Sequence, residues 1–408
     1  MNEQIIDYSK IPDAPLFVCE INDPQYNLFG WLVIHTVGAR GCCGGVRIYP
    51  DVTKREIELL AKGMTYKYCI CKYALGGAKA GIRMSLDTDK RKRSAILQRF
   101  GQHIAPLIRY RIYHPWTDMN CSIEDMACIY KGAQKTMKVP PYDSAYFTAL
   151  TTFSALLAMR DQLAIPAAQC KVTIEGFGKV GQYLAMEIVK SGSKVIGLSN
   201  LHGAVFNSDG LDTDSVIEAK REFGDAWVRQ KGCWAQIPAD QLHLLNMDIH
   251  IPCARTHSLT AEKANQITCK AVVPAANGPC SDEAKGILFS KGVTLLPYFV
   301  VNIGGIIGSG LAALGAKDFQ VRDLFLTEHF QMISRLLQLS EQKQVSPVFL
   351  AKTEADKFYP TLVGSFFKTE TKSKLLKKLR TFVMPSQKQL LKEKFATIKD
   401  AFNSRFLS

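Results

Sequence analysis

Several features that mark other protein classes are missing from this sequence of 408 residues. Its twelve cysteines form no Cys-x-x-Cys pair and have no cluster of histidines beside them, so we expect no bound metal. The first ten residues contain no apolar stretch before a small-residue cleavage site, so we expect no secretory signal. Reduced thiols in a cytoplasmic protein are the simplest interpretation.

One uncharged stretch, residues 292–316, is long enough for a membrane-spanning helix. It nevertheless contains Pro297, Asn302 and six glycines. This punctuation is typical of a strand, a Gly-rich turn and a buried helix. We therefore expect no membrane span.

Negative charge is in short supply, because 51 Lys and Arg face 37 Asp and Glu. Residues 341–408 hold fourteen of the basic and six of the acidic residues, so more than half of the net charge of +14 lies in this tail. The tail also carries two apolar stripes, which need burial somewhere. The stripes are Leu375, Leu376, Leu379 and Phe382, and then Leu391, Phe395, Ile398, Phe402 and Phe406.

The sequence does have the composition of an ordinary folded protein, with 47% hydrophobic and 22% charged residues. Its first part predicts strands at 28–36 and 46–49, a glycine turn at 75–81, and helices at 53–73, 93–110 and 123–131. Later, helices at 146–160 and 180–190 alternate with strands at 171–174, 194–198, 248–251, 271–273 and 293–296. Such alternation indicates an α/β fold with a parallel sheet.

A Gly-x-Gly-x-x-Gly pattern follows the strand at 171–174 and opens the next helix. It consists of Gly176, Phe177, Gly178, Lys179, Val180 and Gly181. In this context the glycines permit a tight turn, and a pyrophosphate meets free N–H groups at the helix N-terminus. The alternative is an ordinary Gly-rich turn. The second strand ends in Ser199-Asn200 without the carboxylate that would hold ribose hydroxyls, so NAD and NADP both stay open.

Two lysines and an aspartate in the first part of the chain are candidates for catalysis. Lys67 lies in the predicted helix, Lys79 in the predicted glycine turn, and Asp118 in the segment His-Pro-Trp-Thr-Asp-Met-Asn. A lysine with few solvated neighbours can have a lowered pKa and act as an acid, a base or a carbonyl polariser. The alternative is that these are solvated surface charges.

Around these residues the sequence resembles the Glu/Leu/Phe/Val dehydrogenase family of amino-acid dehydrogenases. Seven motifs stand in family order over roughly residues 25–315. They are Cys43-Gly44-Gly45-Val46-Arg47, Gly63-Met64-Thr65-Tyr66-Lys67, Gly76-Gly77-Ala78-Lys79-Ala80-Gly81, Thr117-Asp118-Met119-Asn120, Gly176 to Gly181, Ala276-Asn277-Gly278-Pro279 and Asn302-Ile303-Gly304-Gly305.

The resemblance implies a two-domain α/β enzyme with its active site in the cleft between the domains. A substrate-binding and oligomerisation domain would occupy residues 1–143, and an inserted Rossmann-like dinucleotide-binding domain residues 144–302. A helical return over 303–340 would complete the first domain. Residues 341–408, the basic helical C-terminal extension, have no counterpart that we can align.

The resemblance also implies roles for single residues. Lys67 would hold the substrate α-carboxylate, Lys79 would polarise the keto oxygen and activate water, and Asp118 would shuttle protons at the amino group. The other implied substrate-site residues are Gly44, Gly45, Asn302 and Ser309. The cofactor would be NAD or NADP, with NAD favoured, and the implied site comprises the glycine turn together with Thr148, Ser199, Asn200, Ala254 and Asn277.

Two residues give opposite indications of the substrate. Glutamate-type members carry a lysine before the Gly-Gly pair, which binds the side-chain carboxylate. Here that position is Cys43, which favours an apolar amino acid such as Leu, Val or Phe. The motif Gly63-Met64-Thr65-Tyr66-Lys67 also resembles the leucine/phenylalanine/valine branch of the family. Ser309, however, matches a serine of the glutamate enzymes, so Glu stays possible. The family's acidic residues are also replaced by Pro274 and Tyr298, and Arg255 stands where the family is commonly uncharged.

The leading hypothesis is an NAD(P)-dependent, homo-oligomeric enzyme that deaminates an L-amino acid reversibly to a 2-oxo acid and ammonia. The alternative is a homologue that has lost turnover and binds a partner through its basic tail. Packing of the tail on the body or on an oligomer neighbour explains the tail more simply than a nucleic-acid partner does.

Overall fold

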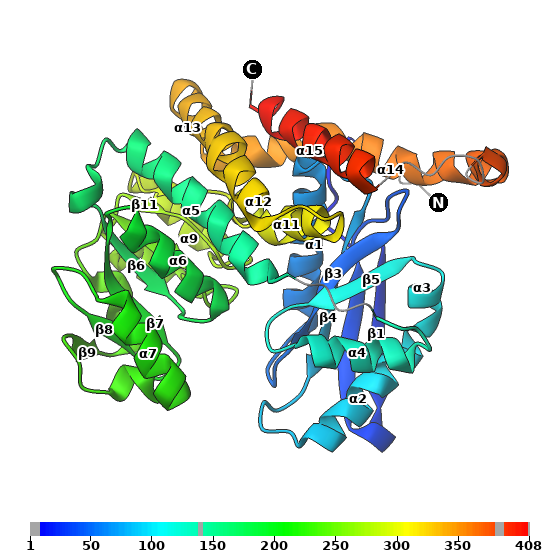
Figure 1. Ribbon diagram of the computed structural model, residues 1–408, viewed down its shortest axis with the longest axis horizontal. Coiled ribbons are helices and arrows are strands. Elements are labelled where there is room, and N and C mark those ends of the chain that lie inside the picture. The colour runs from blue at the N-terminus through cyan, green and yellow to red at the C-terminus, as the bar shows by residue number, and fades with distance from the viewer. Residues whose placement is uncertain (1–8, 138–141, 380–386, 407–408) are drawn as a thin grey trace. The chain divides into compact units, whose positions relative to one another are not determined.

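The computed structural model describes residues 9–137, 142–379 and 387–406, and of these it describes only the backbone for 365–379 and 387–388. The chain divides into two compact units, both of α/β construction as the sequence predicts (Figure 1). Unit 1 comprises residues 1–141 and 352–385, and unit 2 comprises residues 142–351 and 386–408.

Unit 1 contains a mixed five-stranded sheet in the order β1-β2-β4-β3-β5. The strands are β1 (Phe17–Asp23), β2 (Leu28–Ile34), β3 (Cys42–Ile48), β4 (Gly76–Arg83) and β5 (Tyr113–Thr117). β3 runs parallel to β4 and β5, whereas β2 runs antiparallel to β1 and β4. The carboxyl ends of β3, β4 and β5 therefore lie at the same edge of the sheet.

Alternating side chains separate the two faces of this sheet. On one face Val33 packs with Ile57 and Leu60 of α1 (Lys54–Ile70). On the other face Leu32 and Ala80 belong to a larger core. That core includes residues of α2 (Lys90–His103), α3 (Ala105–Arg109) and α4 (Ile123–Gly132). The predicted helix at 93–110 is thus two helices, which meet at Ile104, just before Pro106.

Strand β4 shows that the predicted glycine turn at 75–81 is wrong. The segment is a central strand, hydrogen-bonded to β2 and β3. Its glycines serve close packing instead of a turn. A Cβ on Gly76 would lie 1.8 Å from the carbonyl oxygen of Thr36, and one on Gly77 would lie 2.2 Å from the backbone nitrogen of Thr65 on α1. Glycine in a strand often marks such a close backbone approach.

Unit 2 contains a seven-stranded sheet in the order β12-β11-β10-β6-β7-β8-β9. The strands are β6 (Lys171–Glu175), β7 (Lys194–Asn200), β8 (Gly203–Phe206), β9 (Ala235–Ile237), β10 (Ile249–Pro252), β11 (Ala271–Val272) and β12 (Thr294–Leu295). The first five strands in the spatial order are parallel, and β8 and β9 are antiparallel. The α-helices of unit 2 up to residue 343 are α5 (Ser144–Gln162), α6 (Lys179–Lys190), α7 (Thr213–Phe223), α8 (Ala261–Gln266), α9 (Asp282–Ser290), α10 (Tyr298–Val301), α11 (Gly304–Ala313), α12 (Asp318–Leu324) and α13 (Phe330–Lys343).

The order of the parallel strands defines a topological switch point. The chain passes from β6 through α6 to β7 on one side, and later returns to β10 on the other side of β6. In open α/β sheets, ligands bind outside the carboxyl ends of the strands at such a point. The ends of β6 and β10 are therefore where a dinucleotide is expected to lie.

The uncharged stretch 292–316 forms β12, α10 and α11, as the sequence predicts. Among the described helices, none combines the length and the apolar character needed to span a bilayer. Residues 303–340 group with unit 2, although the resemblance implies a return to the first domain. The reason is close packing, because a Cβ on Gly304 would lie 1.9 Å from the carbonyl oxygen of Phe147 in α5.

The tail divides between the units. From Lys352 on, α14 (Pro347–Leu379) belongs to unit 1. There Tyr359 and Leu362 are buried, and Asp356 accepts a hydrogen bond from the backbone of Ile11 (3.0 Å). The apolar stripe predicted from Leu375 to Phe382 lies outside the described side chains.

In unit 2, α15 (Gln387–Asn403) packs against α11 and α13. Ile398, Phe402 and Phe406 are buried, and the Phe402 ring meets His329 edge to face, with centroids 5.6 Å apart. Arg335 donates a hydrogen bond to the carbonyl oxygen of Asn403 (2.8 Å). Packing within unit 2 is thus confirmed for Ile398, Phe402 and Phe406 of the second stripe, whereas Leu391 and Phe395 are half-buried.

Candidate active site

The charged residues of unit 1 gather on the sheet face that α1 covers. Lys79 on β4 has the same facing as Gly77, whose position abuts α1, and Arg47 lies opposite Gly81 on the neighbouring strand β3. Lys67 lies in the last turn of α1. Lys67 and Lys79 are only 6% and 3% exposed, so both lysines are buried and neither is the solvated surface charge of the alternative reading.

Asp118 follows β5 directly and brings the charges together. Its Oδ1 lies 2.9 Å from Nζ of Lys79, and its Oδ2 lies 2.8 Å from Nε of Arg47. Burial alone would raise the pKa of Asp118, but Arg47 and Lys79 hold it well below its usual range. Asp118 is therefore an ionised carboxylate between two cations.

The two lysines are tuned in the same direction. Burial and the nearby charge of Lys79 lower the pKa of Lys67 to about 7, against the opposing influence of Asp118. Burial also lowers the pKa of Lys79, although Asp118 pulls it upward, and Arg47 adds to the lowering. Amines with lowered pKa values can exchange protons near neutral pH, which an acid/base or carbonyl-polarising role requires.

Two adjacent glycines on β3 stand beside this group. A Cβ on Gly44 would lie 1.6 Å from the carbonyl oxygen of Ala78, and one on Gly45 would lie 2.7 Å from Cβ of Asp118. The carbonyl oxygen of Gly44 also accepts a hydrogen bond from the Tyr113 hydroxyl (2.9 Å). Both glycines are thus needed for the close approach of β3 to its neighbours, and Gly45 lets Asp118 lie against the strand.

Cys43 precedes these glycines on the same face as Arg47. Burial raises the pKa of its thiol, although a hydrogen bond with Tyr68 and the charge of Lys79 act in the opposite direction. The side chain at this position is therefore a neutral thiol beside an α1 hydroxyl.

In unit 2 the predicted glycine turn connects β6 to α6, as expected. Gly176 has a left-handed backbone (φ 104°), which favours glycine. A Cβ on Gly181 would lie 2.3 Å from the carbonyl oxygen of Gly176, so the third glycine permits close packing of helix and strand. Gly178 is the N-cap of α6, and a Cβ there would have no described heavy atom within 4 Å. The turn thus leaves open space at a helix N-terminus, which fits a pyrophosphate.

The three residues between the glycines of the turn, Phe177, Lys179 and Val180, differ in burial. Phe177 is buried, and its ring lies 5.2 Å from that of Trp227. Its carbonyl oxygen accepts a hydrogen bond from Lys220 (2.7 Å). Lys179 is exposed and Val180 is half-buried. Only the backbone of Phe177 is thus presented to a ligand, whereas the side chain anchors the turn.

Ser199, Asn200 and Ala254 lie at the carboxyl ends of strands next to the turn. The carbonyl oxygen of Ser199 accepts a hydrogen bond from the backbone of Gly176 (3.1 Å). Asn200 donates to the carbonyl oxygen of Asp225 (2.7 Å) and accepts from the backbone of His202 (2.8 Å). A Cβ on Gly176 would lie 3.0 Å from the backbone of Ala254, so the segment after β10 borders the turn.

A second polar group of unit 2 centres on Asn302. Its side-chain nitrogen donates to the carbonyl oxygen of Ala275 (2.9 Å) and to Oδ1 of Asn277 (3.0 Å). The buried Oδ1 of Asn302 and Oγ of Ser309 have no hydrogen-bond partner among the described residues. An unsatisfied buried acceptor is costly, so a bound amide or hydroxyl donor is expected to satisfy it. A nicotinamide carboxamide has the required donor.

Thr148 on α5 has a packing role in the described structure. Its hydroxyl donates to the carbonyl oxygen of Ser144 (2.9 Å), and a Cβ on Gly305 would lie 2.8 Å from this hydroxyl. α11 therefore lies close to Thr148.

The structure places the predicted residues in two groups. Unit 1 holds Lys67, Lys79, Asp118, Gly44 and Gly45, and unit 2 holds the glycine turn, Thr148, Ser199, Asn200, Ala254, Asn277, Asn302 and Ser309. A site formed by both groups, as the resemblance implies, stays a prediction.

Sequence reasoning missed Arg47 and Glu56 as members of the charged group. Nη1 of Arg47 lies 2.6 Å from Oε1 of Glu56, which is in the first turn of α1. The period of two along β3 could have shown that Arg47 shares a face with Cys43. Nothing in the sequence pattern pointed to Glu56.

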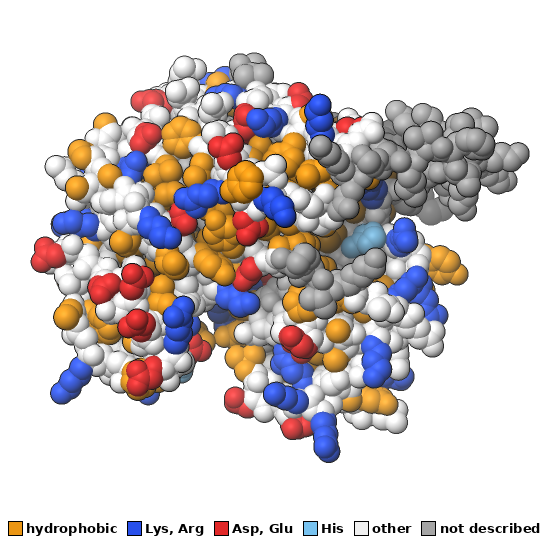
Figure 2. Space-filling model, viewed as in Figure 1, with side chains coloured by type: hydrophobic (Ala, Val, Ile, Leu, Met, Phe, Trp, Pro, Cys, Tyr) orange, Lys and Arg blue, Asp and Glu red, His pale blue; other side chains and the backbone are white. Residues whose placement is uncertain are grey.

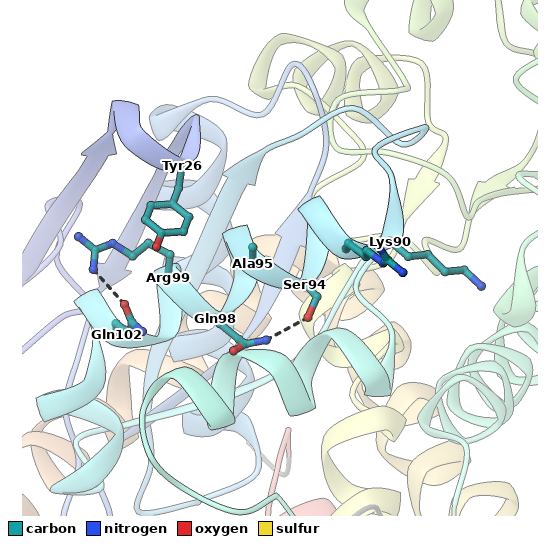
Figure 3. A pocket seen from close by; sticks show the side chains of 8 residues that line it. Tyr26, Lys90, Ser94, Ala95, Gln98, Arg99 and Gln102 are labelled. Atoms are coloured by element: carbon teal, nitrogen blue, oxygen red, sulfur yellow. Dashed lines mark hydrogen bonds between the residues drawn. The ribbon is translucent and has the colours of Figure 1, made fainter.

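A surface hollow of about 490 Å³ on unit 1 is formed by other residues (Figure 3). It is lined by Tyr26 and seven residues of α2, where Gln98 donates to Ser94 and Arg99 donates to Gln102, both at 3.0 Å. None of the predicted site residues lines it.

Comparison with known proteins gives a consistent result. A family model described as Glutamate/Leucine/Phenylalanine/Valine dehydrogenase matches residues 142–343, and one described as the Glu/Leu/Phe/Val dehydrogenase dimerisation domain matches residues 18–135. A glutamate dehydrogenase of Thermotoga maritima is 31% identical over 310 residues, which cover 71% of this chain and 73% of that protein. The NADP-specific glutamate dehydrogenase A1 of Halobacterium salinarum is 27% identical, with 75% and 78% covered.

A similar solved structure is the hetero-hexameric glutamate dehydrogenase of Thermus thermophilus in a leucine-bound form. The TM-score is 0.73 at 20% identity, with 86% of this chain and 89% of that chain covered. This likeness concerns the fold, whereas the family models cover most of the sequence. The chain therefore belongs to the Glutamate/Leucine/Phenylalanine/Valine dehydrogenase family, a family of NAD(P)-dependent amino-acid dehydrogenases.

Proposed function

We propose that this enzyme oxidises an L-amino acid with an uncharged side chain to the 2-oxo acid and ammonia, reversibly and with a nicotinamide cofactor. The observation that carries the proposal is the charged group of unit 1, in which Lys67 and Lys79 are buried and Asp118, 14% exposed, lies 2.9 Å from Lys79. An α-amino acid needs a cation for its carboxylate and an acid/base group for its nitrogen, and this group offers both.

Each residue of the group has one task in this proposal. Lys67 binds the α-carboxylate, and the incoming negative charge favours the protonated amine despite its burial. Lys79 withdraws a proton from water that attacks the imino carbon, and later polarises the keto oxygen. Asp118, 2.9 Å from Lys79, receives and returns protons at the substrate nitrogen. A bound nicotinamide would supply the hydride acceptor that oxidation at the substrate Cα requires.

The glycine turn of unit 2 supports binding of the cofactor. Its open N-cap position, Gly178, adjoins free N–H groups at the start of α6, and the unpartnered acceptor of Asn302 suits a carboxamide donor. NAD is favoured over NADP in this proposal. Two described lysines stand at the turn. Lys220 is engaged by the carbonyl oxygen of Phe177 and by Asp225 (3.2 Å). Nζ of the exposed Lys179 lies 3.8 Å from Oδ2 of Asp143, so a 2′-phosphate would have to compete with these partners.

Cys43 supports an uncharged substrate side chain. A neutral thiol offers no charge to a substrate γ-carboxylate, and burying a carboxylate without a cation is costly. The relatives compared above are glutamate dehydrogenases, so they support amino-acid deamination but not the apolar preference. The preference therefore rests on Cys43 and on the resemblance of the motif Gly63-Met64-Thr65-Tyr66-Lys67 to the leucine/phenylalanine/valine branch.

The proposal is tested by the absorbance of reduced nicotinamide with NAD and NADP separately, and with Leu, Val, Ile, Phe and Glu as substrates. We expect turnover with an apolar amino acid. The variant Cys43→Lys should raise the ratio of kcat/KM for Glu over Leu by roughly tenfold to a hundredfold, because a cation is added beside the substrate. The matched variant Cys43→Ser keeps a small neutral side chain and should leave this ratio within about threefold. Turnover of Glu alone by the wild type would refute the apolar preference.

We further propose that the enzyme is a homo-oligomer with no nucleic-acid partner. The match of residues 18–135 to a dimerisation domain supports the first part. Figure 2 shows Lys and Arg side chains interspersed with Asp and Glu on the visible face of the described residues, which supports the second part. The cytoplasmic location stays a prediction.

A further inference from the structure

Arg47 is a buried cation to which neither the sequence motifs nor the family assignment gives a role. Its guanidinium is 4% exposed and makes two ion pairs, with Oδ2 of Asp118 at 2.8 Å and with Oε1 of Glu56 at 2.6 Å. A buried guanidinium held between two carboxylates has a fixed position, because any rotation breaks a charge-assisted hydrogen bond.

The second carboxylate is itself fixed by the start of α1. Thr53 caps this helix by accepting a hydrogen bond from the backbone of Glu56 (3.2 Å). An acidic residue in the first turn is also favoured by the helix dipole. Glu56 therefore anchors Arg47 from the helix, and Arg47 reaches Asp118 from β3.

Both oxygens of Asp118 are engaged as a result. Oδ1 faces Lys79 and Oδ2 faces Arg47, so the carboxylate cannot turn about its Cβ–Cγ bond without losing one contact. Gly45 sets the other boundary, since a Cβ there would lie 2.7 Å from Cβ of Asp118. Oδ1 is therefore the oxygen of Asp118 that can exchange a proton beside Lys79, because Oδ2 is held by Arg47.

We propose that Arg47, anchored by Glu56, is the positioning residue that holds Asp118 against Lys79 for proton transfer. This inference rests on the proposed function and identifies what sets the geometry of the same site. The electrostatics agree with it, because Arg47 lowers the pKa of both Asp118 and Lys79. Loss of Arg47 should therefore move the pH dependence of turnover to higher pH.

The test compares kcat, KM and the pH profile of kcat/KM for Arg47→Gln, Arg47→Lys and the wild type. For Arg47→Gln we expect kcat to fall about a hundredfold with little change in KM, and the alkaline rise of kcat/KM to occur at higher pH. Arg47→Lys keeps the charge but not the fork, so its profile should stay near that of the wild type while kcat falls about tenfold. Arg83→Gln removes an arginine of β4 that donates to the carbonyl oxygen of Val52, and this control should change neither profile nor kcat.

A double variant separates positioning from folding. Arg47→Gln leaves Glu56, which is 14% exposed, without its cation, and Arg47→Gln/Glu56→Gln removes that charge as well. The double variant should recover thermal stability but keep the shifted pH profile, because Asp118 still lacks Arg47. An unshifted profile in the folded double variant would overturn the inference.

A second readout does not depend on turnover. The pH dependence of Lys79 acetylation by acetic anhydride, measured by mass spectrometry, should shift upward in both Arg47→Gln variants, since a neighbouring positive charge is lost. The same midpoint in the variants and the wild type would refute the inference. If the wild type turns over no amino acid and the variants still show the shifted midpoint, the proposed function alone is refuted.

Discussion

The two groups of site residues differ in the types of residue that form them. In unit 1 the site consists of buried charges, with Lys79, Asp118 and Arg47 in direct ion pairs. In unit 2 it consists of glycines at the end of β6 and of amides around Asn302, where open space and the side-chain oxygens of Asn302 and Ser309, which have no hydrogen-bond partner among the described residues, replace charge. The first arrangement suits chemistry, since buried charges shift pKa values. The second suits recognition of a ligand through backbone groups.

The difference also has an energetic side. Buried ions are costly unless they are paired, so unit 1 must keep its carboxylates and cations in balance. Glycines cost backbone entropy instead, and close packing of the kind seen at Gly181 and Gly304 offsets it. Substitutions in unit 1 should therefore change rate and pH dependence, whereas those in unit 2 should change ligand affinity or packing.

The largest expected effect is the loss of turnover in Lys79→Met, which keeps much of the side-chain volume but removes the amine. We expect kcat to fall on the order of a thousandfold, because an acid/base group contributes about that much. The affinity for reduced nicotinamide, measured by fluorescence, should stay the same, since the predicted cofactor residues lie in unit 2. A near-normal kcat in this variant would show that Lys79 is not a catalytic residue. A loss of cofactor affinity would show that unit 1 also contributes to cofactor binding.

Much of unit 2 was predictable because its sequence follows local rules. The strand at 171–174, the glycine turn and the helix from Val180 all appear as β6, the turn and α6. Period, turn glycines and a helix start carry enough local information for this unit. The same rules failed at Gly76 and Gly77, where glycine composition predicts a turn and tertiary packing against Thr36 and Thr65 makes a strand.

The candidate site shows the same limit. Lys67, Lys79 and Asp118 were found because their motifs resemble a family. Glu56 was not found, because its contact with Arg47 joins a helix start to a strand and leaves no periodic signal. Asn200 was expected at the ribose. In the structure its amide hydrogen-bonds with the carbonyl oxygen of Asp225 and with the backbone of His202, and the tertiary contact with Asp225 leaves no signal in the sequence pattern.

A smaller effect is expected on stability in Lys67→Met. The pKa of Lys67 is lowered from 10.5 in the unfolded chain to about 7 in the folded chain, so folding opposes the protonated amine. The variant should be more stable than the wild type by about 3–5 kcal/mol below pH 7, where the wild type bears the full cost of this lowered pKa. As the pH rises from about 7 to 10.5, only the unfolded wild type stays protonated, so the difference should shrink and vanish.

Denaturant unfolding at pH 6, 8 and 10 measures this change. Lys54→Met is the matched control, because Lys54 lies on the same helix and is 52% exposed. Its stability should differ from that of the wild type by less than about 0.5 kcal/mol at every pH. A gain for Lys67→Met that does not depend on pH would mean that apolar packing, not charge burial, accounts for it.

The smallest expected effect distinguishes a cofactor turn from an ordinary turn in unit 2. Gly178→Ala adds a methyl group where no described heavy atom lies within 4 Å, and its φ of −76° suits alanine, so the melting temperature should not change. Affinity for reduced nicotinamide should fall about tenfold, because the methyl group occupies space that a pyrophosphate needs. Gly181→Ala is the converse, since its Cβ would lie 2.3 Å from the Gly176 carbonyl oxygen and should lower stability by about 1–3 kcal/mol. If Gly178→Ala leaves both affinity and stability unchanged, the turn is an ordinary βα connection. The proposed contrast between catalytic charges in unit 1 and cofactor recognition by backbone groups in unit 2 would then be wrong.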